Sequence, residues 1–238
     1  MNNQLLNFLF DSNHKRMKRI LFFIMMIGCS SAFAQSRLVK NLATGKDQFV
    51  VVYGTSLSSG GHGESWMGEV TRYMNEKYGN HLTFCLAGEG GKWSTWGVQH
   101  LENNVIAKNP NVVIMEFGIN DAVQRYNMSP ELVRLNLKYM IDRIRLANPS
   151  CEIILQVMNM AIGQSAVTRP NLVHIYDVYR KVAKKEKLLL IDHYSNWQKI
   201  LDQGEPAFLK YVTDGLHPNG EGGRKIIAPE IIKCLEAK

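Results

Sequence analysis

Val50-Val51-Val52-Tyr53-Gly54-Thr55-Ser56-Leu57 is the stretch that decides the fold, because a continuous apolar run ends there at a glycine and a serine. Such a run fits a strand that is buried on both faces, as in a parallel sheet. Gly54 permits a tight turn without steric cost. Ser56 then stands at the carboxyl end of the strand, where open α/β sheets bind their ligands. The alternative is that Ser56 only caps a following helix.

Four further apolar stretches have the length of buried strands, and they cover residues 81–86, 112–117, 152–158 and 188–191. Segments with helical spacing of apolar residues separate them, so strands recur about every 30–40 residues, the length of a βαβ unit. One such helix has clear ends, with Ser129 at the N-cap, Pro130 at the first helical position and Asn148 at the end. The pattern predicts one α/β domain with a doubly wound parallel sheet.

Several segments carry no periodic pattern and are expected to be irregular. They are the polar lead-in 35–47, the glycine-rich loop 58–63 ahead of a helix over 64–78, and the loops 159–170 and 203–213. The last helix is expected from about Gly220, with Pro229 causing a kink or a late start.

The net charge of +7 is distributed in a way that does not point to nucleic acid. Residues 1–34 carry a net +3, which leaves +4 for residues 35–238. The basic residues of the latter segment do not alternate with aromatic ones, as nucleic-acid binding would require. We therefore expect no nucleic-acid partner.

The N-terminus has the pattern of an export signal. Basic residues 15–19 precede the apolar run 20–28, and Ala32-Phe33-Ala34 forms a small-x-small cleavage site. We expect residues 1–34 to be a signal peptide, with Met17 as an alternative start, and residues 35–238 to form the exported periplasmic or secreted domain. In a second interpretation, Cys29 is the lipid anchor of a lipoprotein. We expect the protein to be attached to a membrane only in that case.

Three cysteines remain after cleavage at Ala34, and an odd number cannot be fully paired. Cys85 lies in an apolar strand and is expected to be a small core residue. Whether Cys151 and Cys234 pair stays open. No CxxC or His/Cys cluster indicates a metal site, and no cofactor is expected.

Polar residues far apart in the sequence are predicted to meet at one edge of the sheet. Right-handed crossovers place every strand-to-helix loop at the same edge, so Ser56, Gly88 and Asn120 converge there. Asp214 and His217 are three residues apart in a loop ahead of the last helix. Serine catalysis requires a base, a carboxylate that orients the base, and N–H donors for the oxyanion, and this set supplies all of them.

This constellation resembles the SGNH hydrolases, or GDSL-type esterases. Their four motifs correspond here to Gly54-Thr55-Ser56, Gly88, Gly118-Ile119-Asn120-Asp121 and Asp214-Gly215-Leu216-His217, in the expected order. The resemblance implies a flavodoxin-like three-layer sandwich with a five-stranded parallel sheet. It also implies that Ser56 is the nucleophile, that His217 is the base oriented by Asp214, and that Ser56, Gly88 and Asn120 form the oxyanion hole.

One residue departs from the family pattern, since Thr55 stands where an aspartate is usual. Among single residues, His193 follows the strand 188–191 and is a rival base. Trp93 and Trp96 follow the Gly88 loop and either stack on a sugar ring or belong to the core.

The sequence thus predicts an exported serine esterase that removes a small acyl group, with acetyl as the expected group, from a carbohydrate. The prediction of a carbohydrate substrate rests on export, on the two tryptophans and on the acetylesterases among similar family members. The expected partner is a small-molecule or polysaccharide acyl ester. The alternatives are a lysophospholipase- or thioesterase-like lipid esterase, and a catalytically inactive glycan-binding module.

Overall fold

The computed structural model describes residues 35–237, which contain one five-stranded sheet with all strands parallel. The strand order is β2-β1-β3-β4-β5, the doubly wound order that the sequence pattern predicts. The strands are β1 (Gln48–Gly54), β2 (Leu82–Leu86), β3 (Val112–Glu116), β4 (Glu152–Val157) and β5 (Leu189–Asp192).

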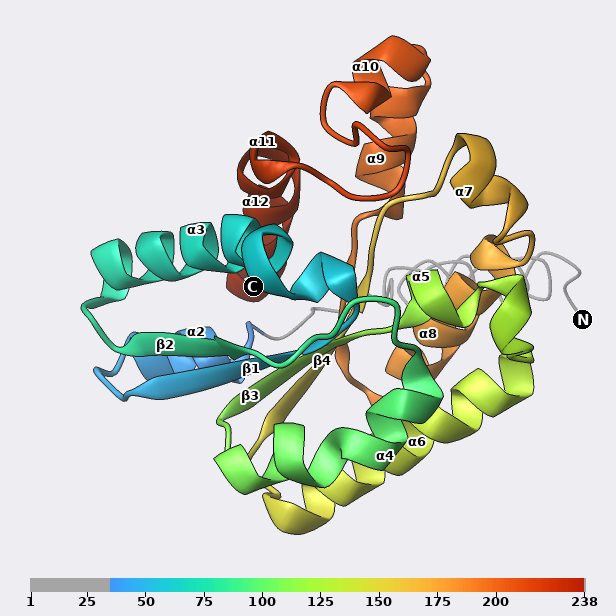
Figure 1. Cartoon of the computed structure of the whole chain (residues 1–238). Helices are drawn as coiled ribbons and strands as arrows, with labels where there is room; N and C mark the ends of the chain where they lie inside the picture. Colours follow the sequence, from blue (N-terminus) through green and yellow to red (C-terminus); the bar gives the residue numbers. More distant parts are fainter. Residues whose placement is uncertain (1–34, 238) are drawn as a thin grey trace, which may run out of the picture. The chain divides into compact units, whose positions relative to one another are not determined.

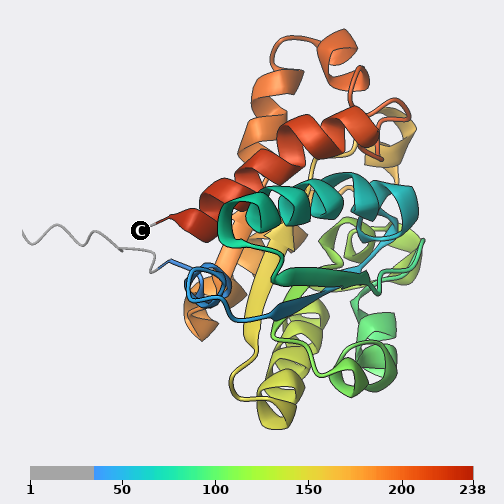
Figure 2. The same cartoon turned by 90° about the vertical axis from the view of Figure 1, so that its left-hand side faces the viewer.

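The central strands are buried because helices cover both faces of the sheet (Figures 1 and 2). One face carries the helices α3 (Gly60–Tyr78) and α12 (Ala228–Glu236), which contact each other. The opposite face carries α4 (Ser94–Asn104), α6 (Pro130–Ala147) and α8 (Leu172–Glu186). This three-layer arrangement explains why β1 and β3 are apolar at nearly every position.

Helix α6 begins as its sequence predicts. The Ser129 hydroxyl accepts the N–H of Leu132 at 3.1 Å, and Pro130 occupies the first turn. The helix ends at Ala147, and Asn148 is the C-cap. Its apolar stripe, which packs against the sheet and neighbouring helices, comprises Val133, Leu137, Met140, Ile141 and Ile144.

Three segments expected to be irregular contain short helices, so those expectations were wrong. They are α2 (Arg37–Leu42), α7 (Gly163–Val167) and α10 (Glu205–Leu209). Tertiary contacts fix such short segments; in α2, for example, the N–H of Ser36 donates to Leu235 O at 3.2 Å, and the N–H of Arg37 donates to Glu152 Oε1 at 3.0 Å.

Helix α3 also begins earlier than expected, at Gly60 rather than Glu64. A Cβ on Gly63 would lie 2.8 Å from the backbone of Ser58, so glycine is required where the helix passes the preceding turn. Gly63 therefore serves close packing, whereas a Cβ on Gly60 or Gly61 would meet nothing within 4 Å.

The C-terminal segment consists of α11 (Gly220–Gly222), a π-helical turn η4 (Gly223–Ile227) and α12. Pro229 lies in the first turn of α12. The backbone is helical from Gly220 onward, as expected, and the π-helical turn just ahead of Pro229 interrupts the α-helical pattern. Shorter elements at the ends of the strands are η1 (Ser56–Ser58), α5 (Gly118–Asp121), η3 (Gln124–Tyr126), α9 (Tyr194–Leu201) and η2 (Ile106–Lys108).

Cys85, Cys151 and Cys234 are all free thiols, so Cys151 and Cys234 do not pair. No helix within residues 35–237 is both long and apolar enough to cross a bilayer. The predicted signal peptide, the alternative start at Met17 and the lipid-anchor reading of Cys29 lie outside the described residues.

Candidate active site

A pocket of about 500 Å³ lies at the carboxyl ends of the strands, where the loops after β1, β2, β3 and β4 meet. Its position is the one that doubly wound sheets use for ligands. The lining residues come from five separate segments of the chain: Ser56, Gly91, Asn120, Val123, Gln124, Arg125, Tyr126, Thr168, Arg169, Leu216 and His217.

Ser56, His217 and Asp214 form one chain of hydrogen bonds at this pocket. Ser56 Oγ lies 2.9 Å from His217 Nε2, and His217 Nδ1 lies 2.7 Å from Asp214 Oδ2. Because the carboxylate accepts the Nδ1 proton, Nε2 is left unprotonated and faces the hydroxyl. This is the geometry that general-base activation of a serine hydroxyl requires.

The loop that carries Asp214 and His217 is held by its own backbone and by the segment after β4. Asp214 Oδ1 accepts the N–H groups of Leu216 at 2.9 Å and His217 at 2.7 Å. Gly215 has φ +74°, and its carbonyl accepts the N–H of Ile162 at 2.8 Å. A glycine is needed at this position because L-residues rarely adopt that backbone conformation.

The Asp214 carboxylate stays ionised over the whole neutral range. Partial burial raises its pKa, but the hydrogen bonds from the backbone and ring of His217 and from Leu216 N–H outweigh this effect and lower the pKa to about 2. An ionised carboxylate beside Nδ1 stabilises the imidazolium that forms when His217 takes a proton.

The turn that presents Ser56 is held by a buried carboxyl group on the neighbouring strand. Glu116, at the end of β3, accepts the Thr55 hydroxyl at 2.7 Å, the Thr55 N–H at 3.2 Å and the Ser58 hydroxyl at 3.0 Å. Thr55 Oγ1 in turn accepts the N–H of Leu57 at 3.2 Å. A Cβ on Gly54 would lie 2.3 Å from the Glu116 carbonyl oxygen, so β1 must end in glycine.

Two carboxyl groups beneath the site have raised pKa values. Burial raises the pKa of Glu116 to about 7, although the hydrogen bonds from Thr55 and Ser58 oppose the shift. Burial likewise raises the pKa of Asp121 to about 7, against a hydrogen bond that the N–H of Ser94 donates at 2.8 Å. Both groups are buried, and neither is among the residues that line the pocket.

Asn120 lies beside Ser56 in the pocket lining, as the sequence predicts. Its Nδ2 donates one hydrogen to Lys92 O at 2.9 Å, and its Oδ1 accepts Arg169 Nη2 at 3.4 Å. An amide nitrogen carries two hydrogens, so the second is available to a ligand. Arg169 and Lys92 together fix which way the amide points.

Gly88 is not among the residues that line the pocket, so its role as an oxyanion donor stays a prediction. The N–H groups of Ala87 and Glu89 both donate to β1, and amides alternate sides along an extended strand, so the Gly88 N–H faces away from β1. A Cβ on Gly88 would lie 2.8 Å from the carbonyl oxygen of Ser58, which gives the residue a packing role. Gly91 lines the pocket, and its N–H has no acceptor within residues 35–237.

The two tryptophans do not face the pocket. Trp96 is 8% exposed and packs in the core, with its ring 5.8 Å from Tyr53 and stacked at 4.5 Å on His100, so the prediction that it binds sugar is wrong. Trp93 stacks on Tyr126 at a centroid distance of 4.1 Å. Tyr126 is among the residues that line the pocket, whereas Trp93 is not.

His193 is not among the residues that line the pocket. It is fully buried and contacts Gln156 Nε2 at 3.1 Å, and burial lowers its pKa to about 4. His62 stacks on His217 at a centroid distance of 5.1 Å and contacts Pro218 O through Nδ1 at 2.9 Å.

Sequence reasoning missed Gly91, Glu116 as the partner of Thr55, and the loop residues Tyr126 and Arg169. A signal existed for Glu116, since an acidic residue inside a buried strand needs a partner. Tyr126 lies in the three-residue helix η3 and Arg169 lies in a loop, and neither segment has a periodicity from which the direction of a side chain could be predicted. Within the described range, no three His, Cys, Asp or Glu side chains are grouped to hold a metal ion.

Solved structures with this fold include several esterases. A lipase/acylhydrolase from Enterococcus faecalis is 22% identical, with a TM-score of 0.68 over 79% of this chain and 95% of that one. An acetylxylan esterase from Geobacillus stearothermophilus is 17% identical, with a TM-score of 0.68 over 81% and 96%. A two-domain esterase active on acetylated mannans is 18% identical, with a TM-score of 0.68 over 85% of this chain and 53% of that one. At these identities the likeness shows the fold alone.

No curated protein matches the chain. The model of one protein family does match it, over residues 52–225, a range that includes Ser56, Asn120, Asp214 and His217. This match covers well over half of the chain and agrees with the fold and with the motifs described above. The chain belongs to the GDSL-like lipase/acylhydrolase family.

Proposed function

We propose that the protein is a serine esterase that removes a short acyl group, acetyl in the first instance, from a carbohydrate. The observation that carries the proposal is the chain of hydrogen bonds from Ser56 through His217 to Asp214, which opens on a pocket at the ligand-binding edge of the sheet. Membership of an acylhydrolase family supports the same chemistry.

In the proposed mechanism, Ser56 Oγ bonds to the ester carbonyl carbon while its proton passes to His217 Nε2. The C–O bond to the alcohol then breaks, and the alcohol leaves with the proton from His217. Water attacks the acyl-enzyme next, giving its proton to His217, and the acid is released as Ser56 recovers its proton. Asp214 stabilises the imidazolium in both steps.

The negative charge of the tetrahedral intermediate requires donors beside Ser56. We assign this role to the N–H of Ser56, to the free hydrogen of Asn120 Nδ2, and to the N–H of either Gly88 or Gly91. Ser56, Asn120 and Gly91 lie in the pocket lining, and neither the Gly88 N–H nor the Gly91 N–H has an acceptor within residues 35–237.

The lining favours a short acyl group and a polar alcohol over a lipid. Its aliphatic members are Val123 and Leu216, which are too few for a long acyl chain, and most of the others are polar or charged. Tyr126 offers an aromatic wall that suits a sugar ring. The acetylxylan and acetylated-mannan esterases among the structural neighbours support a carbohydrate substrate.

We also propose that the enzyme is exported, on the signal pattern of residues 1–34. Mass spectrometry of the mature N-terminus tests this proposal. A start at Gln35 is expected, and a lipid-modified Cys29 would instead place the enzyme on a membrane.

The direct test compares p-nitrophenyl acetate with p-nitrophenyl esters of longer acids. The wild type should prefer acetate, and Ser56→Ala should lose at least about 10³-fold in rate. Ser59→Ala is the matched control, since Ser59 is half-buried one turn away and should keep its activity. Preference for long chains would favour a lipid esterase. Activity that survives in Ser56→Ala would refute the assigned nucleophile.

A further inference from the structure

Positive charge in the pocket is not balanced by a carboxylate. Arg125 and Arg169 both line it, and no aspartate or glutamate is among the lining residues that the structure describes. Neither arginine forms an ion pair within residues 35–237. Arginines elsewhere on the surface do so; Arg72, for example, lies 2.6 Å from Glu69.

Arg169 is half-buried and held in place by neutral groups. Its Nε donates to Ile119 O at 2.9 Å, Nη1 donates to Ser165 O at 3.1 Å and to Thr168 Oγ1 at 3.2 Å, and Nη2 donates to Asn120 Oδ1 at 3.4 Å. Because these acceptors are uncharged, they orient the guanidinium without cancelling its charge. A guanidinium has five N–H groups, so one on Nη2 remains free.

Arg125 is exposed but is also held against the pocket wall. Its Nη2 donates to the Tyr126 hydroxyl at 2.9 Å, and its guanidinium carbon lies 4.9 Å from the centre of the Tyr126 ring. Tyr126 is fixed in turn, since its hydroxyl donates to Gly91 O at 2.6 Å. Burial lowers the pKa of Arg169, and the Arg125 cation lowers it further, as expected for two cations that share one site.

We propose that the pocket takes an ester whose alcohol part carries an anionic oxygen group, a carboxylate or a phosphate, held by Arg125 and Arg169 while the acyl group lies at Ser56. This inference rests on the proposed function. Planar guanidinium groups bind carboxylate and phosphate oxygens with paired hydrogen bonds. A purely structural role would account for the bonds of Arg169, but it gives no reason for a second arginine in the same pocket.

Three acetylated sugars that differ at one position test the proposal. Each is a methyl hexoside with one O-acetyl group, and position 6 carries a carboxylate, a phosphate or a carboxamide, the last being uncharged and close in size to the carboxylate. Calorimetry on Ser56→Ala measures binding, and acetate release by the wild type gives kcat/KM. At least one charged sugar should exceed the carboxamide by ~10- to 100-fold in both binding affinity and kcat/KM. Whichever charged sugar has the higher values identifies the anionic group that the pocket prefers.

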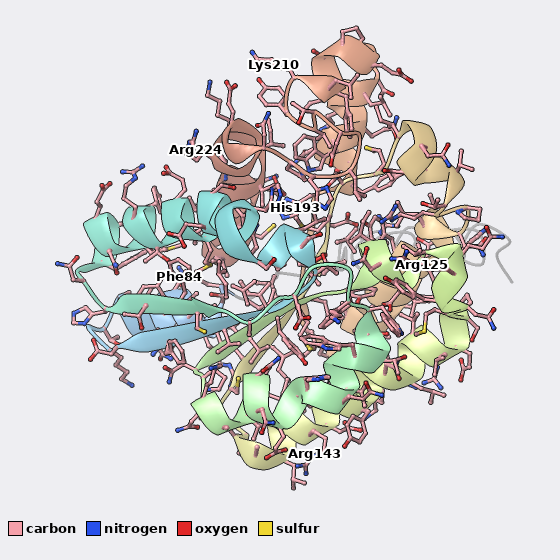
Figure 3. The ribbon with its side chains drawn as sticks, viewed as in Figure 1. Phe84, Arg125, Arg143, His193, Lys210 and Arg224 are labelled. Carbon is pink, nitrogen blue, oxygen red and sulfur yellow. The ribbon has the colours of Figure 1, made fainter. Side chains whose placement is uncertain are left out.

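Variants at two arginines show whether the pocket causes this preference. Arg125→Gln should reduce the ratio of charged to uncharged substrate, and Arg125→Lys should restore part of it. Arg143→Gln is the control, because it removes the same charge from a half-buried arginine on α6 that pairs with Glu102, far from Arg125 (Figure 3). The ratio should not change in that variant, and it should fall in wild type as salt is added.

Equal binding and equal hydrolysis of the three sugars would overturn the inference and leave the esterase proposal intact. Failure of the wild type to hydrolyse any sugar ester or p-nitrophenyl ester would refute the esterase proposal. Calorimetry then still decides on the anion site: a preference for a charged sugar supports it, and no preference or no binding overturns it.

Discussion

Replacement of Glu116 by glutamine should abolish a large part of the pH dependence of folding stability. Glu116 is 1% exposed, and burial raises its pKa from 4.5 to about 7. The folded protein therefore retains a proton that the unfolded chain releases between these values. Stability from this group is fully present below pH 4.5 and is lost as the pH rises towards 7.

The magnitude follows from the two pKa values. A difference between 4.5 and about 7 corresponds to about 3 kcal/mol of unfolding free energy. Glutamine imitates the protonated acid, since its amide can donate to Thr55 Oγ1 while its oxygen still accepts from Thr55 N–H and Ser58. We expect Glu116→Gln to match the wild type within about 1 kcal/mol at pH 4.5 and to be more stable by about 3 kcal/mol at pH 8.

Urea unfolding, followed by the fluorescence of buried Trp66 and Trp96, measures the difference between pH 4.5 and 8. Asp121 has a similar raised pKa but is present in both proteins, so its contribution largely cancels. Glu102→Gln, at an exposed carboxylate, is the control and should give a curve parallel to the wild type. A parallel curve for Glu116→Gln as well would refute the reasoning, because the carboxyl group would then titrate alike in both states.

Four further substitutions separate catalysis from packing. Asp214→Asn should lower kcat by ~10²- to 10⁴-fold while the urea midpoint stays unchanged, and a normal kcat would remove Asp214 from the mechanism. Trp96→Ala should cost about 3–5 kcal/mol of unfolding free energy, whereas Trp93→Ala should cost less than about 1.5 kcal/mol; similar costs would contradict the burial of Trp96. Gly88→Ala places a Cβ 2.8 Å from two backbone carbonyl oxygens, so its urea midpoint should fall sharply, and a stable variant would show that the turn can shift.

Features of the sheet could be predicted because they depend on burial alone. Residues 50–53 and 112–115 are apolar at every position, and both strands prove to be buried on both faces. The five- and six-residue helices α2, α7 and α10 could not be predicted, because so few residues show no periodicity. The early start of α3 depends on how closely Gly63 passes Ser58, which is a contact between segments.

The candidate site likewise has parts that the sequence predicts and parts that it does not. The grouping of Ser56, Asn120 and His217 follows from the order of strands and loops, and the structure brings all three to one pocket. The choice between Gly88 and Gly91 depends on which side of an extended segment each N–H faces, and a motif does not contain this information. The role of Trp96 was ambiguous from the sequence, because an aromatic residue next to a ligand-binding loop can either contact the ligand or pack in the core.

The point where the chain enters the domain bears on how the enzyme could be immobilised. The N–H of Arg37 donates to Glu152 at the first residue of β4, so the domain begins at the amino end of the sheet, and the pocket lies at the carboxyl end. Six residues at about 3.3 Å each separate the two ends by about 20 Å. A tether, resin or fusion partner joined ahead of Gln35 would extend from the end of the sheet opposite the pocket. It would therefore not block a bulky polymeric substrate from reaching Ser56.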